Sequence, residues 1–168
     1  MTEETVLRSE KGINYTRLRD LLKACKWSEA NGETINIFIR VCKTVDITEE
    51  DIDDFPCTDL LTIDRLWVRY SQGYFGFSTQ MKMLQEIENR EEFGNQVGWR
   101  MNDQWINSSK LRPDESAPIG HFPSIEIGVF MGDISDGKDW VSFSIQGSAM
   151  KIFSRIRACG LSKLLDIW

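Results

Sequence analysis

Histidine, whose side chain can act as a general base or a metal ligand near neutral pH, occurs once in this sequence. His121 lies in the tetrapeptide GHFP. An imidazole there can accept a proton or serve as an axial ligand of a metal. Beside a proline turn, however, a histidine that is bonded to loop backbone is the more frequent arrangement. We therefore expect a structural role for His121, and catalysis is the minor alternative.

Carboxylates are concentrated at 46–54, in the string DITEEDIDD. A catalytic carboxylate needs apolar surroundings that shift its pKa, and this run is polar. Its pattern is typical of a solvated surface. The sequence also contains no GxxxxGK[ST], GxGxxG or HExxH motif, and no GxSxG motif in the right context. Because no nucleophile, base and orienting group come together, the residues favour a binding module over an enzyme.

The four cysteines, Cys25, Cys42, Cys57 and Cys159, are far apart in the chain and form no CxxC pair. With one histidine beside them, this spacing predicts neither a zinc site nor a disulfide scaffold. We expect reduced thiols that pack as small apolar side chains, as in an intracellular protein.

Length and charge narrow the class of protein further. The chain has 168 residues, a formal net charge of -6 and a pI near 4.9. One domain is expected at this length, and the acidic balance argues against binding to nucleic acid. Residues 1–12 lack the features of a secretory signal, and no apolar run is long enough to span a bilayer. A soluble protein is expected, with a precursor trimmed of an import leader as the open alternative.

Apolar periodicity predicts a mostly helical chain. Helices are expected from Asn14 to Cys25, from Ser28 to Cys42, over a short stretch capped by Thr48, from Thr58 to Tyr70, from Ser78 to Ile87, and from about Ala149 to a stop at Gly160. The segment 94–123 is predicted to be mostly loop, and 125–146 to form a β-hairpin. The fold class is therefore all-α, a compact helical domain with long functional loops and a hairpin insertion. We divide it into a polar lead (1–13), one domain (14–161) and a tail (162–168).

The second of these helices is apolar on two faces. One face carries Ala30, Thr34, Ile37, Phe38 and Val41, and a second stripe carries Ile35, Ile39 and Cys42. Such a helix is either packed on both sides or lines a ligand cleft with its second stripe.

The aromatic string WVRYSQGYFGFSTQ at 67–80 suggests a surface for stacking ligands. Its glycines permit a tight turn, however, so we expect Phe75 and Phe77 to be core residues beneath that turn and Tyr74 to be exposed.

Four strings in a fixed order resemble a known family. They are FPCTDLLTIDRLW, YSQGYFGFSTQ, VGWRMNDQW and SAPIGHFP, and together with the opening helices they cover roughly residues 10–123. This combination is similar to the genomes-uncoupled tetrapyrrole-binding domain, the porphyrin-binding regulator of magnesium chelatase in oxygenic phototrophs. The resemblance implies helices whose loops cup a flat tetrapyrrole without catalysing a reaction.

The resemblance also implies where the ligand binds. A protoporphyrin, its magnesium form or a linear bilin is an apolar molecule with propionates at its edge, held non-covalently by apolar side chains and cations. The apolar candidates are Ile35, Phe38, Ile39, Ile52, Trp105, Ile106, Leu111 and Phe122. The candidate partners of the propionates are Lys43, Lys110, Arg112, Arg155 and Arg157. Core packing and solvated surface are the respective alternatives.

Two departures from the family weaken the expectation for magnesium porphyrins. Ile35 stands where well-studied members have an arginine, and the string INSSKLR at 106–112 is less aromatic than their late loop. The expected function is stimulation of magnesium chelatase, with the large porphyrin-binding subunit of that enzyme as partner. A pigment-sensing or protein-interaction module is the alternative. The expected protein is a monomer in a cyanobacterial cytoplasm or a plastid stroma, without a transmembrane segment, and peripheral membrane contact stays open.

Overall fold

Helices form most of the computed structural model, which describes residues 7–106, 110–112, 114–125, 128–130, 140–142 and 145–160. The helices are α1 (Thr16–Lys23), α2 (Trp27–Cys42), α3 (Glu49–Asp53), α4 (Cys57–Tyr70), α5 (Phe77–Glu86), α6 (Arg90–Gln96) and α7 (Ile145–Ala158). Two antiparallel pairs of strands accompany them, β1 (Arg100–Met101) with β2 (Gln104–Trp105) and β3 (Gly128–Phe130) with β4 (Trp140–Ser142). The predicted all-α fold with a β-hairpin is confirmed.

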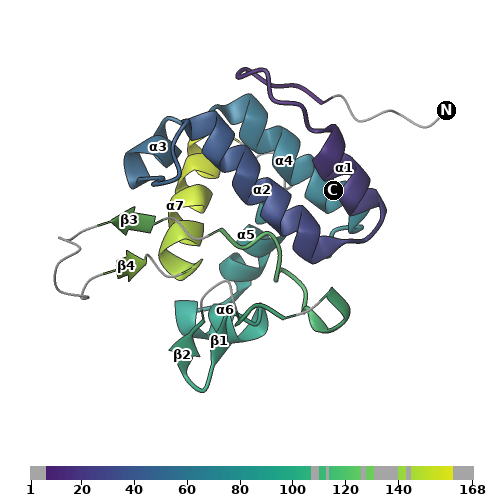
Figure 1. The fold of residues 1–168 in the computed structure, drawn as a ribbon. Helices are drawn as coiled ribbons and strands as arrows, with labels where there is room; N and C mark the ends of the chain where they lie inside the picture. The colour runs from purple at the N-terminus through teal and green to yellow at the C-terminus, as the bar shows by residue number, and fades with distance from the viewer. Residues whose placement is uncertain are drawn as a thin grey trace.

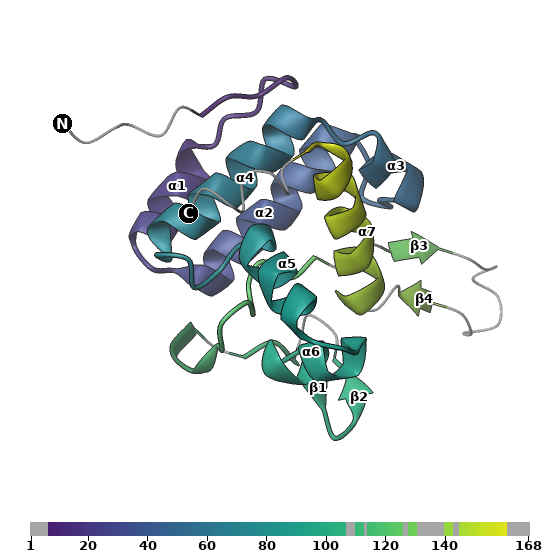
Figure 2. The ribbon, with the colours of Figure 1, turned by 180° about the vertical axis from the view of Figure 1, so that it is seen from behind.

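The helices form an upper group and a lower group. In the upper group α1 packs against both α2 and α4, and α7 packs against α3 and α4 (Figure 1). In the lower group α5 packs against α6, and β1 and β2 lie beside α6 (Figure 2). Asp114 and Ser124, which follow β2 in the chain, lie beside α2, where they bond to Ser28 and Asn31.

The core is centred on α4, whose apolar side chains recur at helical spacing. Leu60, Ile63, Leu66 and Trp67 are buried, as the sequence predicts. Trp67 donates its indole N–H to the Thr34 hydroxyl of α2 at 3.0 Å, so the one polar atom of this ring is satisfied inside the core.

The aromatic turn between α4 and α5 is a structural element. Phe75 and Phe77 are 2% and 1% exposed, whereas Tyr74 is 44% exposed, which confirms all three predictions. Phe75 lies edge-on to Trp27, Trp67 and Phe122. The turn therefore belongs to the core.

Local capping signals predict some helix starts correctly. Thr48 is the N-cap of α3, where it exchanges hydrogen bonds with Asp51 in a capping box. These bonds hold the pKa of Asp51 below its ordinary value. Asn89 caps α6 by accepting the N–H of Glu92 at 2.7 Å. The apolar periodicity predicts no helix over Arg90–Gln96, so α6 is an addition to the predicted elements.

Two predicted caps are wrong because the capping carboxylates come from distant parts of the chain. α2 begins at Trp27, and Ser28 donates its N–H and its hydroxyl to Asp114 at 2.8 and 2.6 Å. α5 begins at Phe77, and the N–H of Ser78 donates to Asp64 of α4 at 3.0 Å. Burial raises the pKa of Asp64, while its hydrogen bonds from the start of α5 oppose that change.

The segment 94–123 contains more regular structure than predicted. α6 continues to Gln96, and β1 pairs with β2 in the register Arg100↔Trp105. The predicted hairpin is present as β3 and β4, paired as Val129↔Val141. Ile145, which lies inside the predicted hairpin segment 125–146, begins α7.

The predicted absence of disulfides is wrong. Cys57 at the start of α4 and Cys159 just after α7 form a disulfide, with their Cα atoms 5.5 Å apart and a sequence separation of 102. The fold brings together two cysteines that the sequence places far apart. Cys25 and Cys42 are free, and burial raises the pKa of the Cys42 thiol to about 11.

The described residues contain neither a metal-binding cluster nor a helix that could span a membrane. No group of three or more His, Cys, Asp and Glu side chains among them is arranged to hold a metal ion. In the same part of the chain no helix is long and apolar enough to cross a membrane.

Candidate ligand-binding site

The segment from Ile106 to Ile125, which we call the late loop, is tied to the first half of α2. Ser124 donates its N–H to the Asn31 side chain at 2.8 Å, and the Asn31 amide donates back to the Ser124 carbonyl at 3.2 Å. Ile35 and Ile39 follow Asn31 at four-residue steps, so they continue the same face of the helix. Both are half-buried at the edge of the core. The second stripe of α2 thus begins where the late loop is attached.

His121 is the central support of the late loop. Its side chain is fully buried, with Nδ1 2.6 Å from the carbonyl of Val97 and Nε2 accepting the N–H of Arg112 at 3.0 Å. Gly98, at φ +74, leaves room for this ring, since a Cβ there would lie 3.2 Å from Nδ1. Both nitrogens of the imidazole are occupied by backbone groups. The structural role expected for His121 is the one that this geometry supports.

Other residues of the family strings hold the same segment through its backbone. Gln80 of α5 donates to the carbonyls of Gly120 and Pro123, both at 2.9 Å. The Trp99 indole donates to the carbonyl of His121 at 2.9 Å. Residues of these strings therefore fix residues 120–124 on the helices through hydrogen bonds to the backbone. Gln80 and Trp99 lie in the strings that resemble the family, but no sequence pattern predicts that they bind these carbonyls.

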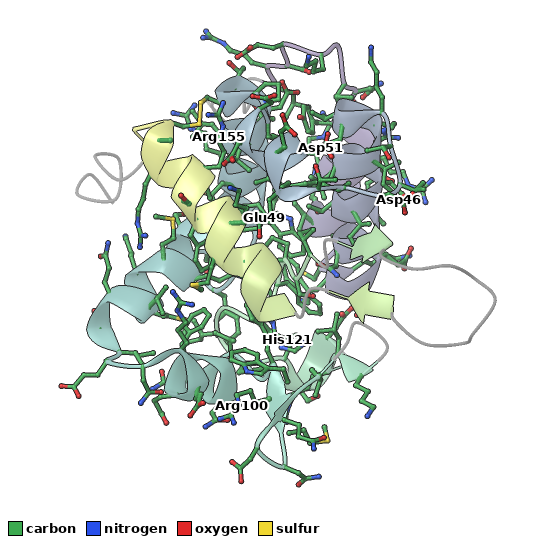
Figure 3. The ribbon with its side chains drawn as sticks, turned by 90° about the vertical axis from the view of Figure 1, so that its left-hand side faces the viewer. Asp46, Glu49, Asp51, Arg100, His121 and Arg155 are labelled. Carbon is green, nitrogen blue, oxygen red and sulfur yellow. A yellow bond between two sulfur atoms is a disulfide. The ribbon has the colours of Figure 1, made fainter. Side chains whose placement is uncertain are left out.

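The loop carries its candidate ligand-binding side chains between two backbone anchors. The N–H of Ile106 donates to the carbonyl of Trp99 at 2.9 Å, and the N–H of Arg112 is held by His121. Between them Lys110 is exposed and Leu111 is half-buried. Figure 3 places His121 beneath the first turns of α7, on the side of the β3–β4 pair.

Not all predicted ligand-binding residues are accessible. Phe38, Ile52 and Phe122 are at most 1% exposed, and Ile106 is 6% exposed. Phe38 packs on Phe55 with ring centroids 4.5 Å apart, and Phe122 stacks on Trp67 at 6.0 Å. These side chains are core residues in this conformation. Ile35, Ile39, Trp105 and Leu111 are half-buried and have surface to offer a ligand.

Trp105 lies against α6 and β1, not over the second stripe of α2. The guanidinium of Arg100 lies 5.7 Å from the centroid of its ring. A Cβ on Gly94 would come within 2.4 Å of Trp105, so α6 and the indole are in close contact. The structure therefore holds Trp105 in the lower group of elements.

The candidate cations fall into separate groups. Lys110 and Arg112 are exposed on the late loop. Arg155 lies toward the other end of α7 from His121 in Figure 3 and donates from Nε to the Phe55 carbonyl at 2.9 Å. Arg157 follows it on α7, and Lys43 is exposed at the end of α2. Lys110 and Arg112 are the pair that the structure places on the loop itself.

Protonation of His121 should destabilise the protein. Burial is the main reason that the pKa of His121 lies below its ordinary value near 6.5, and the nearby Arg112 charge adds to it. Between that ordinary value and the folded pKa the unfolded chain binds the proton and the folded chain does not. We therefore expect the free energy of unfolding to fall as the pH drops below about 6.5, by up to about 1.4 kcal/mol per pH unit.

Urea unfolding at pH 7.5 and pH 5.5 measures this loss, and the same experiment on His121→Gln isolates it. Asp64, whose pKa is raised, contributes a change of opposite sign in both proteins. An equal pH dependence in the two proteins would contradict the assignment to His121.

Comparison with known proteins shows which family the chain resembles. Residues 8–131 match the GUN4-like family model. The Ycf53-like protein of Synechocystis sp. is 30% identical over 129 residues, and the match covers 70% of this chain and 53% of that protein. The protein ycf53 of Porphyra purpurea is 30% identical over 124 residues, 70% of this chain and 52% of that protein. The chain thus spans about half the length of the curated relatives it matches.

Two solved structures share the fold. GUN4 from Chlamydomonas reinhardtii superposes with a TM-score of 0.62 at 24% identity, over 92% of this chain and 95% of the other. Ligand-free GUN4 from Arabidopsis thaliana gives 0.56 at 18% identity, over 89% and 94%. At these identities the structures establish the architecture, and the sequence matches establish the kinship. The resemblance found in the four strings is confirmed, and the chain belongs to the GUN4-like family.

Proposed function

We propose that this chain binds a tetrapyrrole non-covalently and regulates magnesium chelatase by delivering or withdrawing porphyrin. The observation that carries the proposal is the double attachment of the late loop at Ile106 and Arg112. These two hydrogen bonds attach the segment that carries the Leu111 side chain between the cations Lys110 and Arg112. Family membership supplies the class of ligand.

The chemistry of this segment suits a tetrapyrrole edge. Propionates need charge-assisted hydrogen bonds, and the macrocycle needs apolar contacts. Lys110 and Arg112 supply the first, and Leu111 with the Ile35 and Ile39 stripe of α2 supplies the second. Lys43, Arg155 and Arg157 lie elsewhere and are secondary candidates. We propose no catalytic step, since both nitrogens of His121 are hydrogen-bonded to backbone groups.

Ligand binding is tested by titrating the whole chain with protoporphyrin, its magnesium form and a linear bilin, followed by Soret or visible band shifts. We expect micromolar binding of at least one pigment, and failure of all three would contradict the proposal. The double variant Lys110→Ala, Arg112→Ala should bind about tenfold more weakly, because two cations near the propionates are removed. Arg65→Ala, Arg69→Ala removes the same charge from the exposed side of α4 and should bind like the wild type.

A second function is favoured by Ile35, which replaces the arginine of well-studied members. In this alternative the chain senses a pigment or binds a protein partner without acting on the chelatase. A chelatase assay with and without the chain separates the two, because the first function predicts faster metal insertion at low magnesium. We also propose that the partner is the large chelatase subunit and that the protein is a monomer. Its proposed location is a cyanobacterial cytoplasm or a plastid stroma.

A further inference from the structure

Three contacts attach one face of α7 to the connection between α3 and α4. Lys151 and Arg155 are spaced by four and share a face of α7, and Cys159 follows the helix directly. Their partners at 53, 55 and 57 are spaced by two. The contacts are Lys151 Nζ to Asp53 Oδ2 at 2.7 Å, Arg155 Nε to the Phe55 carbonyl at 2.9 Å, and the disulfide of Cys159 with Cys57.

The disulfide is the covalent member of this set, the Arg155 hydrogen bond is partly buried, and the ion pair depends on groups that water reaches. The side chains of Lys151 and Asp53 are 22% and 55% exposed, and an exposed ion pair contributes little to stability. Ile152, Phe153 and Ile156 on the inner face of α7 are buried in the core. Opening the disulfide therefore leaves α7 held mainly by its apolar face.

The sulfur atoms are placed for thiol–disulfide exchange. Cys57 and Cys159 are half-buried, so the bond lies at the edge of the core and not within it. Cys57 is the first residue of α4, a 14-residue helix, and the positive end of a helix stabilises a thiolate. Cys57 is thus the better leaving group, and Cys159 is the sulfur that an incoming thiolate attacks.

We propose that the Cys57–Cys159 disulfide is a reversible redox site, which a dithiol opens and which controls the attachment of α7 to the connection between α3 and α4. The first thiolate of the dithiol bonds to Cys159 and expels the Cys57 thiolate. The second thiolate of the dithiol then displaces Cys159, so the dithiol leaves as a disulfide and the protein gains two thiols. Two electrons pass from the dithiol to the cysteine pair. Neither step involves a tetrapyrrole, so the site does not depend on the proposed function.

Alkylation of the whole chain, analysed by mass spectrometry, tests the chemistry. Oxidised protein that is denatured without reductant should take two labels, at Cys25 and Cys42. Native protein treated with dithiothreitol and then denatured should take four. Four labels before reduction would overturn the proposal, and so would a bond that dithiothreitol opens only in denatured protein.

Hydrogen exchange on the same samples tests the structural consequence. Reduction should speed exchange in 145–158 by at least about tenfold and leave α1 nearly unchanged, because α7 loses its covalent attachment. Cys159→Ser should exchange like the reduced wild type with or without dithiothreitol, whereas Cys25→Ser should respond like the wild type. Unchanged exchange in 145–158 after complete reduction would show a crosslink without control over α7, and would overturn the proposal.

Discussion

Replacing Trp67 by alanine should lower the free energy of unfolding by about 3–5 kcal/mol. The side chain is fully buried, so the substitution opens a cavity in the centre of the molecule. It also removes the indole N–H that donates to Thr34, and the ring that stacks on Phe122 of the late loop. We therefore expect both the helical core and the loop attachment to weaken.

Urea unfolding followed by circular dichroism measures this change, since the other tryptophans of the chain complicate fluorescence. Trp67→Phe is the matched control. It keeps an aromatic ring for Phe122 and loses the hydrogen bond to Thr34, so it should cost clearly less than the alanine variant. A loss below about 1 kcal/mol for Trp67→Ala would contradict the central position of this ring.

Replacing His121 by alanine should cost about 2–4 kcal/mol and free the middle of the late loop. The variant leaves the buried Val97 carbonyl and the partly buried Arg112 N–H without their partner, and a buried group left unpaired costs about 1–3 kcal/mol. The ring contact with Phe122, at 4.7 Å between centroids, is lost as well. Trypsin cleavage after Lys110 should consequently become faster than in the wild type, whereas Pro113 blocks cleavage after Arg112 in both proteins.

His121→Gln is the control for this prediction. A glutamine side chain retains one donor and one acceptor, so it should recover part of the stability and part of the protection from trypsin. A stable alanine variant with an unchanged cleavage pattern would show that the loop is held without His121. Loss of stability with unchanged cleavage would assign the residue to the core alone.

The sequence predicts best where the physical cause is local. Helical spacing places Leu60, Ile63, Leu66 and Trp67 in the core correctly, and Thr48 caps its helix through a residue three positions away. The caps of α2 and α5 fail because Asp114 and Asp64 supply them from 86 and 14 residues away. The prediction that the chain has no disulfide is wrong for the same reason, since the bond depends on the packing of α7 beside α4.

The candidate site shows a second limit of sequence reasoning. Phe38, Ile52 and Ile39 are all apolar residues in or near helices, and their types do not distinguish a core position from a ligand surface. The structure places the first two in the core and leaves Ile39 half-buried. The polar residues that organise the site, Asn31 and Gln80, bind backbone groups whose position no periodicity reveals.

The manner in which the late loop is anchored has a consequence for variation among relatives and for protein engineering. Ile106 and Arg112 are both held through backbone N–H groups, so the anchors make no demand on the side chains at Lys110 and Leu111. Segments from different relatives should therefore be exchangeable at these two boundaries while the helices keep their stability. Under the proposed function, the part of the pigment preference that Lys110, Leu111 and Arg112 determine should move with such a graft.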